Sequence, residues 1–370
     1  MAHRDSHHQR VQSYLEAHYL PDRPTVLYGA GNIGKEVARR LKRIGHFPAC
    51  FIDDTPSKYG KSIDGLTIHS LEDVMSIYGT DFNLIVTILN PNHSFLETKS
   101  RLALLGVCAM PFVALSWVYD GILNGLHANS TPLEITRQRK SIMSLMELWD
   151  DDRSRNEFIL QLLFRLTLDY AYLSERQESC YFPDDVKIRF HDNTTFLDAG
   201  AYNGDTADLA VRELGAKLGR LIAFEPDPHN YHSLVEKIAN LCKQDISILY
   251  QSAIGSDEGK LRFDASADMN SSLSDEGEII VDVQPLSKFI VSDNMYLKFD
   301  IEGSEHSALS SCITSIRRFK PQIAVSVYHN SADLWEIPLL LKSTVPQYKL
   351  YLRNHGIDAT DVICYALLDG

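Results

Sequence analysis

Three charged residues alternate along one short apolar segment. In YLKFDIEG, residues 296–303, the charges fall at Lys298, Asp300 and Glu302, and Gly303 follows them. Side chains on a strand point to opposite faces in turn, so these three share a face near the strand's carboxyl end. Ligands of open α/β sheets bind in the crevice beyond the carboxyl ends of the strands. The segment therefore predicts one edge of a ligand site.

A second strand end carries an acid followed by two glycines. In TTFLDAGAYNGDTADLAVRELG, Asp198, Gly200 and Gly204 follow the strand and precede a helix. An acid at this strand end favours a ligand with a cationic amino acid part over a pyrophosphate. The next strand ends at Glu225, 25 residues after Gly200, where a carboxylate can accept both ribose hydroxyls of a nucleoside. Asp227 competes for that role, although its position after a proline is typical of a turn. Together these features indicate a site for S-adenosylmethionine.

From about Tyr181 onward the chain resembles the FkbM-type methyltransferases. The resemblance rests on six motifs in this order: FLDAGAYNGDTA, IAFEPDPHNYHSL, QSAIGSDEG, NSSLSDEG, YLKFDIEGSEHSAL and IAVSVYHNSADLWEIP. It implies a Rossmann-like methyltransferase fold, S-adenosylmethionine as the methyl donor, and transfer to an oxygen of a sugar, polyketide or related metabolite. One position departs from the family, because Leu286-Ser287 stands where members often have Leu-Asp before the fourth strand.

The donor site is expected to draw on four segments of the second half. Its expected residues are Asp198, Gly200, Ala201, Tyr202, Asn203, Gly204, Asp205, Glu225, Ser252, Ala253 and Asp300. Ser252 and Ala253 are expected to form a wall of small side chains beside the adenine.

The catalytic candidates lie on the segment with alternating charges. A sulfonium donor is already activated, so catalysis consists mainly of positioning and of removing the acceptor's proton. We expect Asp300 to orient the acceptor or take its proton, and Lys298 to keep Asp300 ionised or steer an acidic acceptor. Glu302 either caps the next helix or takes part in catalysis. The stretch Asn270–Ser274 either hydrogen-bonds a polyhydroxylated acceptor or forms a turn.

Two histidines compete as the general base. His329 follows the apolar strand IAVSVY and is preferred, because His306 is explained as a helix-surface residue. No metal is expected, since the acids Asp198, Asp300 and Glu302 do not all lie on one strand and no histidine stands at a fixed spacing from them.

The first half of the chain carries a separate glycine fingerprint. PTVLYGAGNIGKEVARRLKRIG reads as a strand, Gly-x-Gly-x-x-Gly and a helix, and a second strand ends at Asp53 and Asp54. A nucleotide or nucleotide sugar here would meet Gly29, Gly31, Asn32, Ile33, Gly34 and Asp53. DDTPSKYGKSIDGLTIHS resembles the N-terminal Rossmann-like domains of sugar-modifying enzymes. NAD-dependent oxidoreduction is disfavoured, because no Tyr-x-x-x-Lys pair occurs in the chain.

These elements predict an α/β protein with two Rossmann-like units. The second is expected, from the resemblance, to be a class I S-adenosylmethionine-dependent methyltransferase fold. The expected boundaries are 1–120 for a Rossmann-like domain, 121–180 for a helical connector and 181–370 for a methyltransferase domain.

Composition narrows the function. The 370 residues have a formal net charge of −13, which argues against a nucleic-acid partner and favours a small-molecule or glycan acceptor. Six scattered cysteines and an N-terminus without a secretory signal suggest the cytoplasm. The uncharged stretch Leu102–Tyr119 is divided by Gly106 and Pro111, so it is not expected to span a membrane.

Polysaccharide biosynthesis is the expected context. The alternative hypothesis is a catalytically inactive protein that binds a nucleotide sugar or serves as a scaffold. An NAD-dependent oxidoreductase is the third hypothesis. The oligomeric state is left open.

Overall fold

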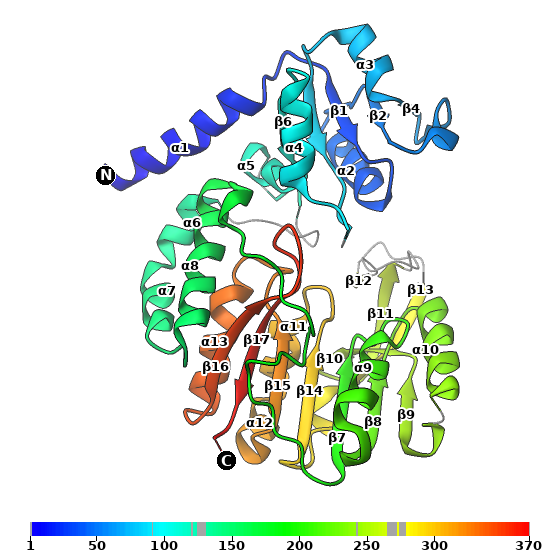
Figure 1. Ribbon diagram of the computed structural model, residues 1–370, viewed down its shortest axis with the longest axis vertical. Helices are drawn as coiled ribbons and strands as arrows, with labels where there is room; N and C mark the ends of the chain where they lie inside the picture. The colour runs from blue at the N-terminus through cyan, green and yellow to red at the C-terminus, as the bar shows by residue number, and fades with distance from the viewer. Residues whose placement is uncertain are drawn as a thin grey trace. The chain divides into compact units, whose positions relative to one another are not determined.

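The chain forms two compact units, each with its own sheets (Figure 1). The computed structural model describes residues 2–90, 92–119, 121–123, 131–241, 243–264, 272–273 and 279–369. The first unit comprises Met1–Arg139, Ile159–Glu175 and Gly356–Ala359, and the second comprises Lys140–Phe158, Arg176–His355 and Thr360–Gly370. The predicted α/β fold with Rossmann-like units is confirmed.

The first unit is built on a six-stranded sheet in the order β3-β4-β2-β1-β5-β6. Every neighbouring pair is parallel except β3 and β4. The strands are β1 (Thr25–Tyr28), β2 (Cys50–Ile52), β3 (Ser62–Ile63), β4 (Leu66–His69), β5 (Asn83–Val86) and β6 (Ala109–Pro111). The helices are α1 (Ala2–His18), α2 (Asn32–Arg43), α3 (Leu71–Tyr78), α4 (Phe95–Leu104), α5 (Leu115–Val118) and α6 (Pro132–Arg137), with short 3₁₀ helices at Pro56–Lys58, Phe112–Ala114 and Tyr170–Tyr172.

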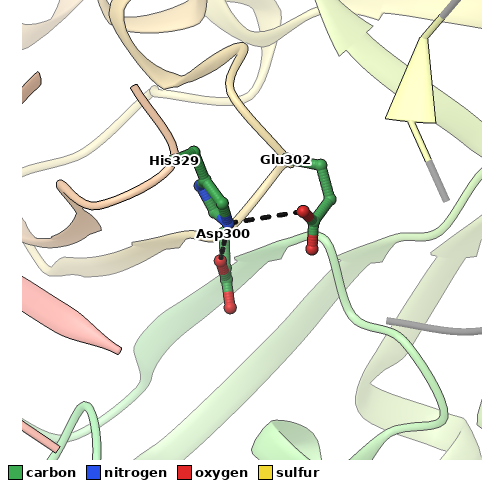
Figure 2. A group of neighbouring side chains, drawn as sticks. All are labelled: Asp300, Glu302 and His329. Carbon is green, nitrogen blue, oxygen red and sulfur yellow. Dashed lines mark ion pairs between the residues drawn. The ribbon is translucent and has the colours of Figure 1, made fainter. Parts of the chain in front are cut away.

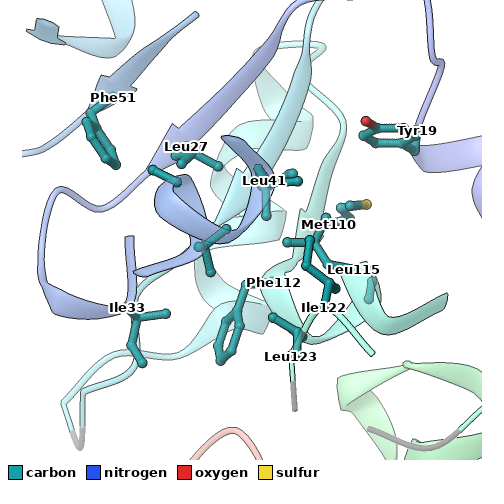
Figure 3. Packing of buried hydrophobic residues seen from close by; sticks show 14 of the residues in the cluster. Tyr19, Leu27, Ile33, Leu41, Phe51, Met110, Phe112, Leu115, Ile122 and Leu123 are labelled. Atoms are coloured by element: carbon teal, nitrogen blue, oxygen red, sulfur yellow. The ribbon is translucent and has the colours of Figure 1, made fainter. Parts of the chain in front are cut away.

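The apolar strands of the first unit bury both faces. On β1, Leu27 packs into one hydrophobic cluster with Phe51, whereas Val26 and Tyr28 pack into another on the opposite face. Figure 3 shows Leu27 and Phe51 in the first cluster, near Leu41 of α2. Strands of a parallel sheet covered on both faces are expected to be continuous apolar runs, as these are.

The second unit contains a seven-stranded sheet in the order β16-β17-β15-β14-β7-β8-β9. The strands from β9 to β15 are parallel, and β17 and β16 are antiparallel to their neighbours. These strands are β7 (Thr194–Ala199), β8 (Leu218–Phe224), β9 (Ser247–Tyr250), β14 (Met295–Phe299), β15 (Gln322–Ser326), β16 (Lys349–Asn354) and β17 (Val362–Leu367). The chain moves outward from β7 through β8 and β9 and then returns to β14 on the other side. The strand order therefore reverses between β7 and β14, which is where ligands bind in open α/β sheets.

Helices and a smaller sheet complete this part of the chain. The smaller sheet has the order β10-β13-β11-β12, with β10 (Ser252–Gly255), β11 (Gly259–Asp264), β12 (Ser272–Leu273) and β13 (Ile279–Pro285). The helices are α7 (Arg139–Met146), α8 (Asp152–Thr167), α9 (Asp205–Leu214), α10 (Pro228–Asn240), α11 (Glu305–Ser311), α12 (Ile313–Phe319) and α13 (Asp333–Thr344), with 3₁₀ helices at Gly215–Lys217, Gln244–Ile246 and Leu286–Lys288.

The connector expected at 121–180 is not a separate body. Helix α8 passes from the second unit into the first, and the preceding and following segments are divided between them. Phe164 and Tyr170 are buried in the core of the first unit. In the second unit, the Ser154 hydroxyl accepts the backbone N–H of Leu352 at 2.9 Å. The two units therefore divide the chain differently from the expected boundaries, because Lys140–Phe158 belongs to the second unit and Ile159–Glu175 returns to the first.

The uncharged stretch Leu102–Tyr119 contributes to the first unit's sheet. It runs from the end of α4 through a turn at Gly106, where φ is 74°, into β6 and α5. Among the described residues, no helix has both the length and the apolar character needed to cross a bilayer.

Candidate active site

Gly200 brings the loop after β7 against the end of β14. Its φ of 85° lies in the left-handed region, and a Cβ built on it would lie 1.8 Å from the backbone oxygen of Asp300. No other residue fits so close to a backbone carbonyl. The glycine therefore fixes how β7 and β14 end beside each other.

Lys298 contacts this turn through its side chain. Its ammonium group pairs with Asp198 Oδ1 at 2.9 Å and donates a hydrogen bond to the carbonyl of Gly200, and both charged side chains are buried. Burial raises the pKa of Asp198 to about 6, although Lys298 opposes that shift. Burial also acts to lower the pKa of Lys298, but Asp198 and Asp300 outweigh it and the pKa is raised. Lys298 thus lies beside the expected donor loop and pairs with Asp198.

Glu225 joins the ends of two strands through backbone hydrogen bonds. It follows β8, and its two carboxylate oxygens accept the N–H groups of Tyr202 and Asp227, each at 2.8 Å. Burial raises the pKa of Glu225 to about 7. Each carboxylate oxygen retains a second lone pair, which matches the expected role of accepting ribose hydroxyls. Asp227 instead caps α10 by accepting the N–H of His229 and Asn230, so it has the turn role considered for it.

The remaining residues of the expected donor loop lie between β7 and α9. Ala201 is buried and donates its N–H to the carbonyl of Phe224, and the side chain of Asn203 accepts the N–H of Asp205 at 3.2 Å. Gly204, with a φ of 85°, precedes α9. The loop therefore runs in one defined path from the strand to the helix.

Ser252 and Ala253, expected beside the adenine, lie on β10 of the smaller sheet. Ser252 is buried, and its hydroxyl has no hydrogen-bond partner in the described part of the chain. Ala253 packs with Val281 and Val283. Their role at the adenine stays a prediction.

Asp300, Glu302 and His329 form what we call the acid–histidine cluster (Figure 2). Asp300 follows β14, Glu302 lies in the loop after it, and His329 follows the neighbouring strand β15. Nε2 of His329 lies 3.5 Å from Asp300 Oδ1 and 3.4 Å from Glu302 Oε2. The parallel pairing of β14 with β15 brings His329 to the same sheet edge as the acids.

Two residues that sequence reasoning did not identify hold this cluster in place. Glu305, whose side chain is 0% exposed, pairs with His329 Nδ1 at 2.9 Å and accepts the N–H groups of Ile301 and Gly303. Tyr181 donates its hydroxyl to Asp300 Oδ2 at 2.7 Å. Glu305 lies in the same motif as Asp300, and its position as an acid at the start of a helix was a signal that could have identified it. Tyr181 is 119 residues from Asp300, and no local pattern links them.

The charged groups of the cluster shift one another's pKa values. Burial acts to lower the pKa of His329, but Glu305 and Glu302 outweigh it and raise that pKa well above its usual value. Burial raises the pKa of Glu302 to about 8. Burial also opposes ionisation of Asp300, yet Lys298 and His329 together keep its pKa below the usual value. Three acids therefore surround one imidazole and differ in how readily they ionise.

The two remaining candidates are His306 and the stretch Asn270–Ser274. His306 is on α11, as expected for a helix residue. Of the stretch Asn270–Ser274, only Ser272 and Leu273 are described, as β12, so its expected contacts to an acceptor lie outside the described residues.

The first unit forms its glycine turn as predicted. Gly29 has a φ of 115°, and a Cβ on Gly34 would lie 1.9 Å from the carbonyl oxygen of Gly29. Gly31 faces open space, Asn32 begins α2, and Ile33 is buried in the core.

The acid of this turn, Asp53, is already engaged. It accepts the N–H groups of Ala30 at 3.1 Å and Thr55 at 3.0 Å, and it pairs with Lys58 at 2.8 Å. The carboxylate expected at a ribose therefore carries an internal cationic partner.

Comparison with known proteins agrees with the predicted fold of the second unit. Residues 198–357 match the family model described as the methyltransferase FkbM domain. The whole chain is also similar in structure to the methyltransferase FkbM from Methylobacillus flagellatus KT, with a TM-score of 0.75 and 21% sequence identity over 98% of this chain and 99% of that chain. The resemblance seen in the sequence is confirmed, and at this identity the structural likeness shows the fold alone.

A second relative partly supports the Rossmann-like character of the first unit. The redox-sensing transcriptional repressor Rex of Roseiflexus sp. (strain RS-1) is 33% identical over 89 residues, or 24% of this chain. The match spans 40% of the length of that repressor.

Proposed function

Because residues 198–357 carry an FkbM methyltransferase domain, we propose that the second unit transfers the methyl group of S-adenosylmethionine to a hydroxyl oxygen. In the first unit, Asp53, the acid after the second strand, is already paired with Lys58. The proposal therefore concerns the second unit only.

One observation carries the proposal: the Gly200 turn and Glu225 meet at the point where the strand order reverses. Glu225 binds the turn through the N–H of Tyr202 at 2.8 Å, and Gly200 packs on the backbone of Asp300. If Glu225 holds the ribose of the donor, the remainder of the donor molecule would lie along the Gly200 turn. The acid–histidine cluster, which includes Asp300, is thereby joined to the donor loop through backbone contact.

The reaction needs positioning and proton removal. A lone pair of the acceptor oxygen forms the new C–O bond while the C–S bond of the donor breaks, and the sulfonium becomes the neutral thioether of S-adenosylhomocysteine. The hydroxyl proton passes to a carboxylate of the acid–histidine cluster. Tyr181, bonded to Asp300 at 2.7 Å, keeps one carboxylate oxygen of Asp300 in place for this role.

The acceptor class follows from the charges at the site. Asp300, Glu302 and Glu305 surround a single histidine, and Lys298 is already paired with Asp198. This environment favours a neutral polyhydroxylated acceptor, such as a sugar or glycan precursor, over the acidic acceptor that a free lysine would attract.

Calorimetric titration with S-adenosylhomocysteine tests the donor assignment. The full chain is expected to bind one equivalent in the second unit. Glu225→Ala is expected to weaken binding by about 2–4 kcal/mol, because it removes the acceptor of two ribose hydroxyls and of two backbone N–H groups. Asp53→Ala, which alters the corresponding acid of the first unit, is the control and should leave the affinity within about twofold.

Equal affinity for the wild type and Glu225→Ala would contradict the donor assignment. Donor binding without methyl transfer to any of a panel of sugars and sugar nucleotides would instead favour the catalytically inactive binding or scaffolding protein.

A further inference from the structure

We propose that the acid–histidine cluster binds one divalent cation through Oδ1 of Asp300, Oε2 of Glu302 and Nε2 of His329. Binding of the cation is independent of the methyltransferase proposal, whereas its role in catalysis rests on that proposal. No metal was expected from the sequence because no histidine stands at a fixed spacing from these acids; in the fold, His329 comes from the end of the neighbouring strand β15.

The spacing of the three atoms fits one shared cation. All three lie within 4.8 Å of one another, and the two distances from His329 Nε2 are 3.4 and 3.5 Å. A cation with ligands at about 2.1 Å places adjacent ligand atoms about 3.0 Å apart and opposite ones about 4.2 Å apart. Movements of a few tenths of an ångström would therefore complete the coordination. The observed distances to the carboxylates are long for direct charge-assisted hydrogen bonds, which are typically about 2.7–2.9 Å.

Two of the three proposed ligands, His329 and Asp300, are oriented by contacts to the side-chain atom that does not face the cation. Glu305 holds Nδ1 of His329, which directs Nε2 toward the two acids, and Tyr181 holds Oδ2 of Asp300, which directs Oδ1 the same way. Asp300 Oδ1 is enclosed and accepts no hydrogen bond from the described residues. Carboxylate support behind a ligating histidine, and hydrogen bonds to ligating carboxylates, are the usual second-layer contacts of metal sites.

The buried charge also calls for a cation. The side chain of His329 is 4% exposed and faces Asp300, Glu302 and Glu305. Further negative potential comes from Asp333 and Asp361, which interact electrostatically with the same histidine. The imidazolium contributes one positive charge to this group of acids, whereas a divalent cation that displaces the Nε2 proton contributes two at the same place. Two carboxylates and an imidazole, without a thiolate, suit Mn²⁺ and similar borderline cations.

The cation would assist the proposed reaction at the acceptor. A hydroxyl bound to it has a lowered pKa, so the proton leaves more readily to the carboxylate oxygens that do not bind the cation. Bound beside Asp300, the cation would also fix the acceptor oxygen close to the donor loop.

Titration of the EDTA-treated full chain with Mn²⁺ tests the inference, with free Mn²⁺ measured by electron paramagnetic resonance. One site is expected in the wild type. Glu302→Gln and Asp300→Asn should each weaken binding at least tenfold. The exposed acid Asp293→Asn is the matched control and should bind as the wild type does. Glu302→Gln keeps the shape of the side chain, so it tests the loss of the ligand charge without a change in packing.

Absence of a single Mn²⁺ site in the wild type, or equal affinity in Glu302→Gln and the control, would overturn the inference. The cluster would then be a buried imidazolium held by acids. Titration of the same samples with S-adenosylhomocysteine separates the two proposals. Donor binding without Mn²⁺ binding refutes only the cation site, and Mn²⁺ binding without donor binding refutes only the donor assignment.

Discussion

Asp53 in the first unit and Glu225 in the second accept equivalent backbone N–H groups, but their electrostatic surroundings differ. Each follows the second strand of its unit and accepts one N–H from the glycine turn and one from two residues downstream. Asp53 also pairs with Lys58 at 2.8 Å, whereas no ion pair of Glu225 occurs in the described ranges. Burial opposes ionisation of both acids, but Lys58 and the hydrogen bonds keep the pKa of Asp53 below its usual value, while the pKa of Glu225 rises to about 7.

The difference separates a structural acid from one that can still bind a ligand. The cationic partner of Asp53 compensates its charge within the protein, so a ribose would have to compete with Lys58. Glu225 has lone pairs to spare and is destabilised as an anion, so hydrogen bonds from two hydroxyls would stabilise it. A glycine fingerprint alone does not distinguish these cases, because both turns have the same backbone requirement.

The largest contrast between the units is expected in turnover. Asp300→Asn removes the charge that orients the hydroxyl or takes its proton, so methyl transfer should fall by about 10²–10⁴-fold while donor affinity changes by less than about tenfold. Asp53→Asn should leave turnover unchanged within about twofold. Both are measured by S-adenosylhomocysteine formation with an acceptor. Near-normal turnover in Asp300→Asn would move the catalytic role to His329.

A second contrast concerns the glycines. Gly200→Ala combines a positive φ with a Cβ 1.8 Å from the Asp300 oxygen, so it should cost at least about 3 kcal/mol of stability. Gly31→Ala meets nothing within 4 Å and has no positive φ, so it should cost less than about 1 kcal/mol. Hydrogen exchange in each unit measures the two effects separately, which matters because unfolding of two units need not be one transition. Comparable losses in both variants would show that the packing at Gly200 is not the cause.

The smallest contrast is the pH dependence of donor binding. Ribose hydroxyls bind ionised Glu225 better, and its pKa is about 7, so donor affinity should rise by up to about tenfold from pH 6 to pH 8. The stability contribution has the opposite sign. Because the folded-state pKa lies above the ordinary value of 4.5, this contribution is fully present below pH 4.5 and is lost as pH rises through about 7.

Calorimetry at several pH values measures the change in affinity. Glu225→Gln should remove the dependence, whereas Asp53→Asn should keep it. An unaltered pH profile in Glu225→Gln would assign the effect to another group.

Much of the fold was predictable because its signals are local. The apolar segments became strands β1, β7, β8 and β14, and both glycine turns formed where a strand meets a helix. These choices depend on residues a few positions apart, namely side-chain periodicity and the positive φ that glycine permits. The division of the chain into units differs from the boundaries expected near 120 and 180, because the core on which each part of α8 packs depends on partners far along the chain.

Local sequence was sufficient to predict the strand ends, the glycine turns and the acids Asp198, Glu225 and Asp300 that lie on or beside them, because each belongs to one continuous segment. The contacts of those acids depend on the tertiary fold. The pairing of β14 with β15 places His329 against Asp300 and Glu302, and the fold brings Tyr181 to Asp300 across 119 residues. Distances between side chains on different strands depend on sheet order and register, which no single segment encodes.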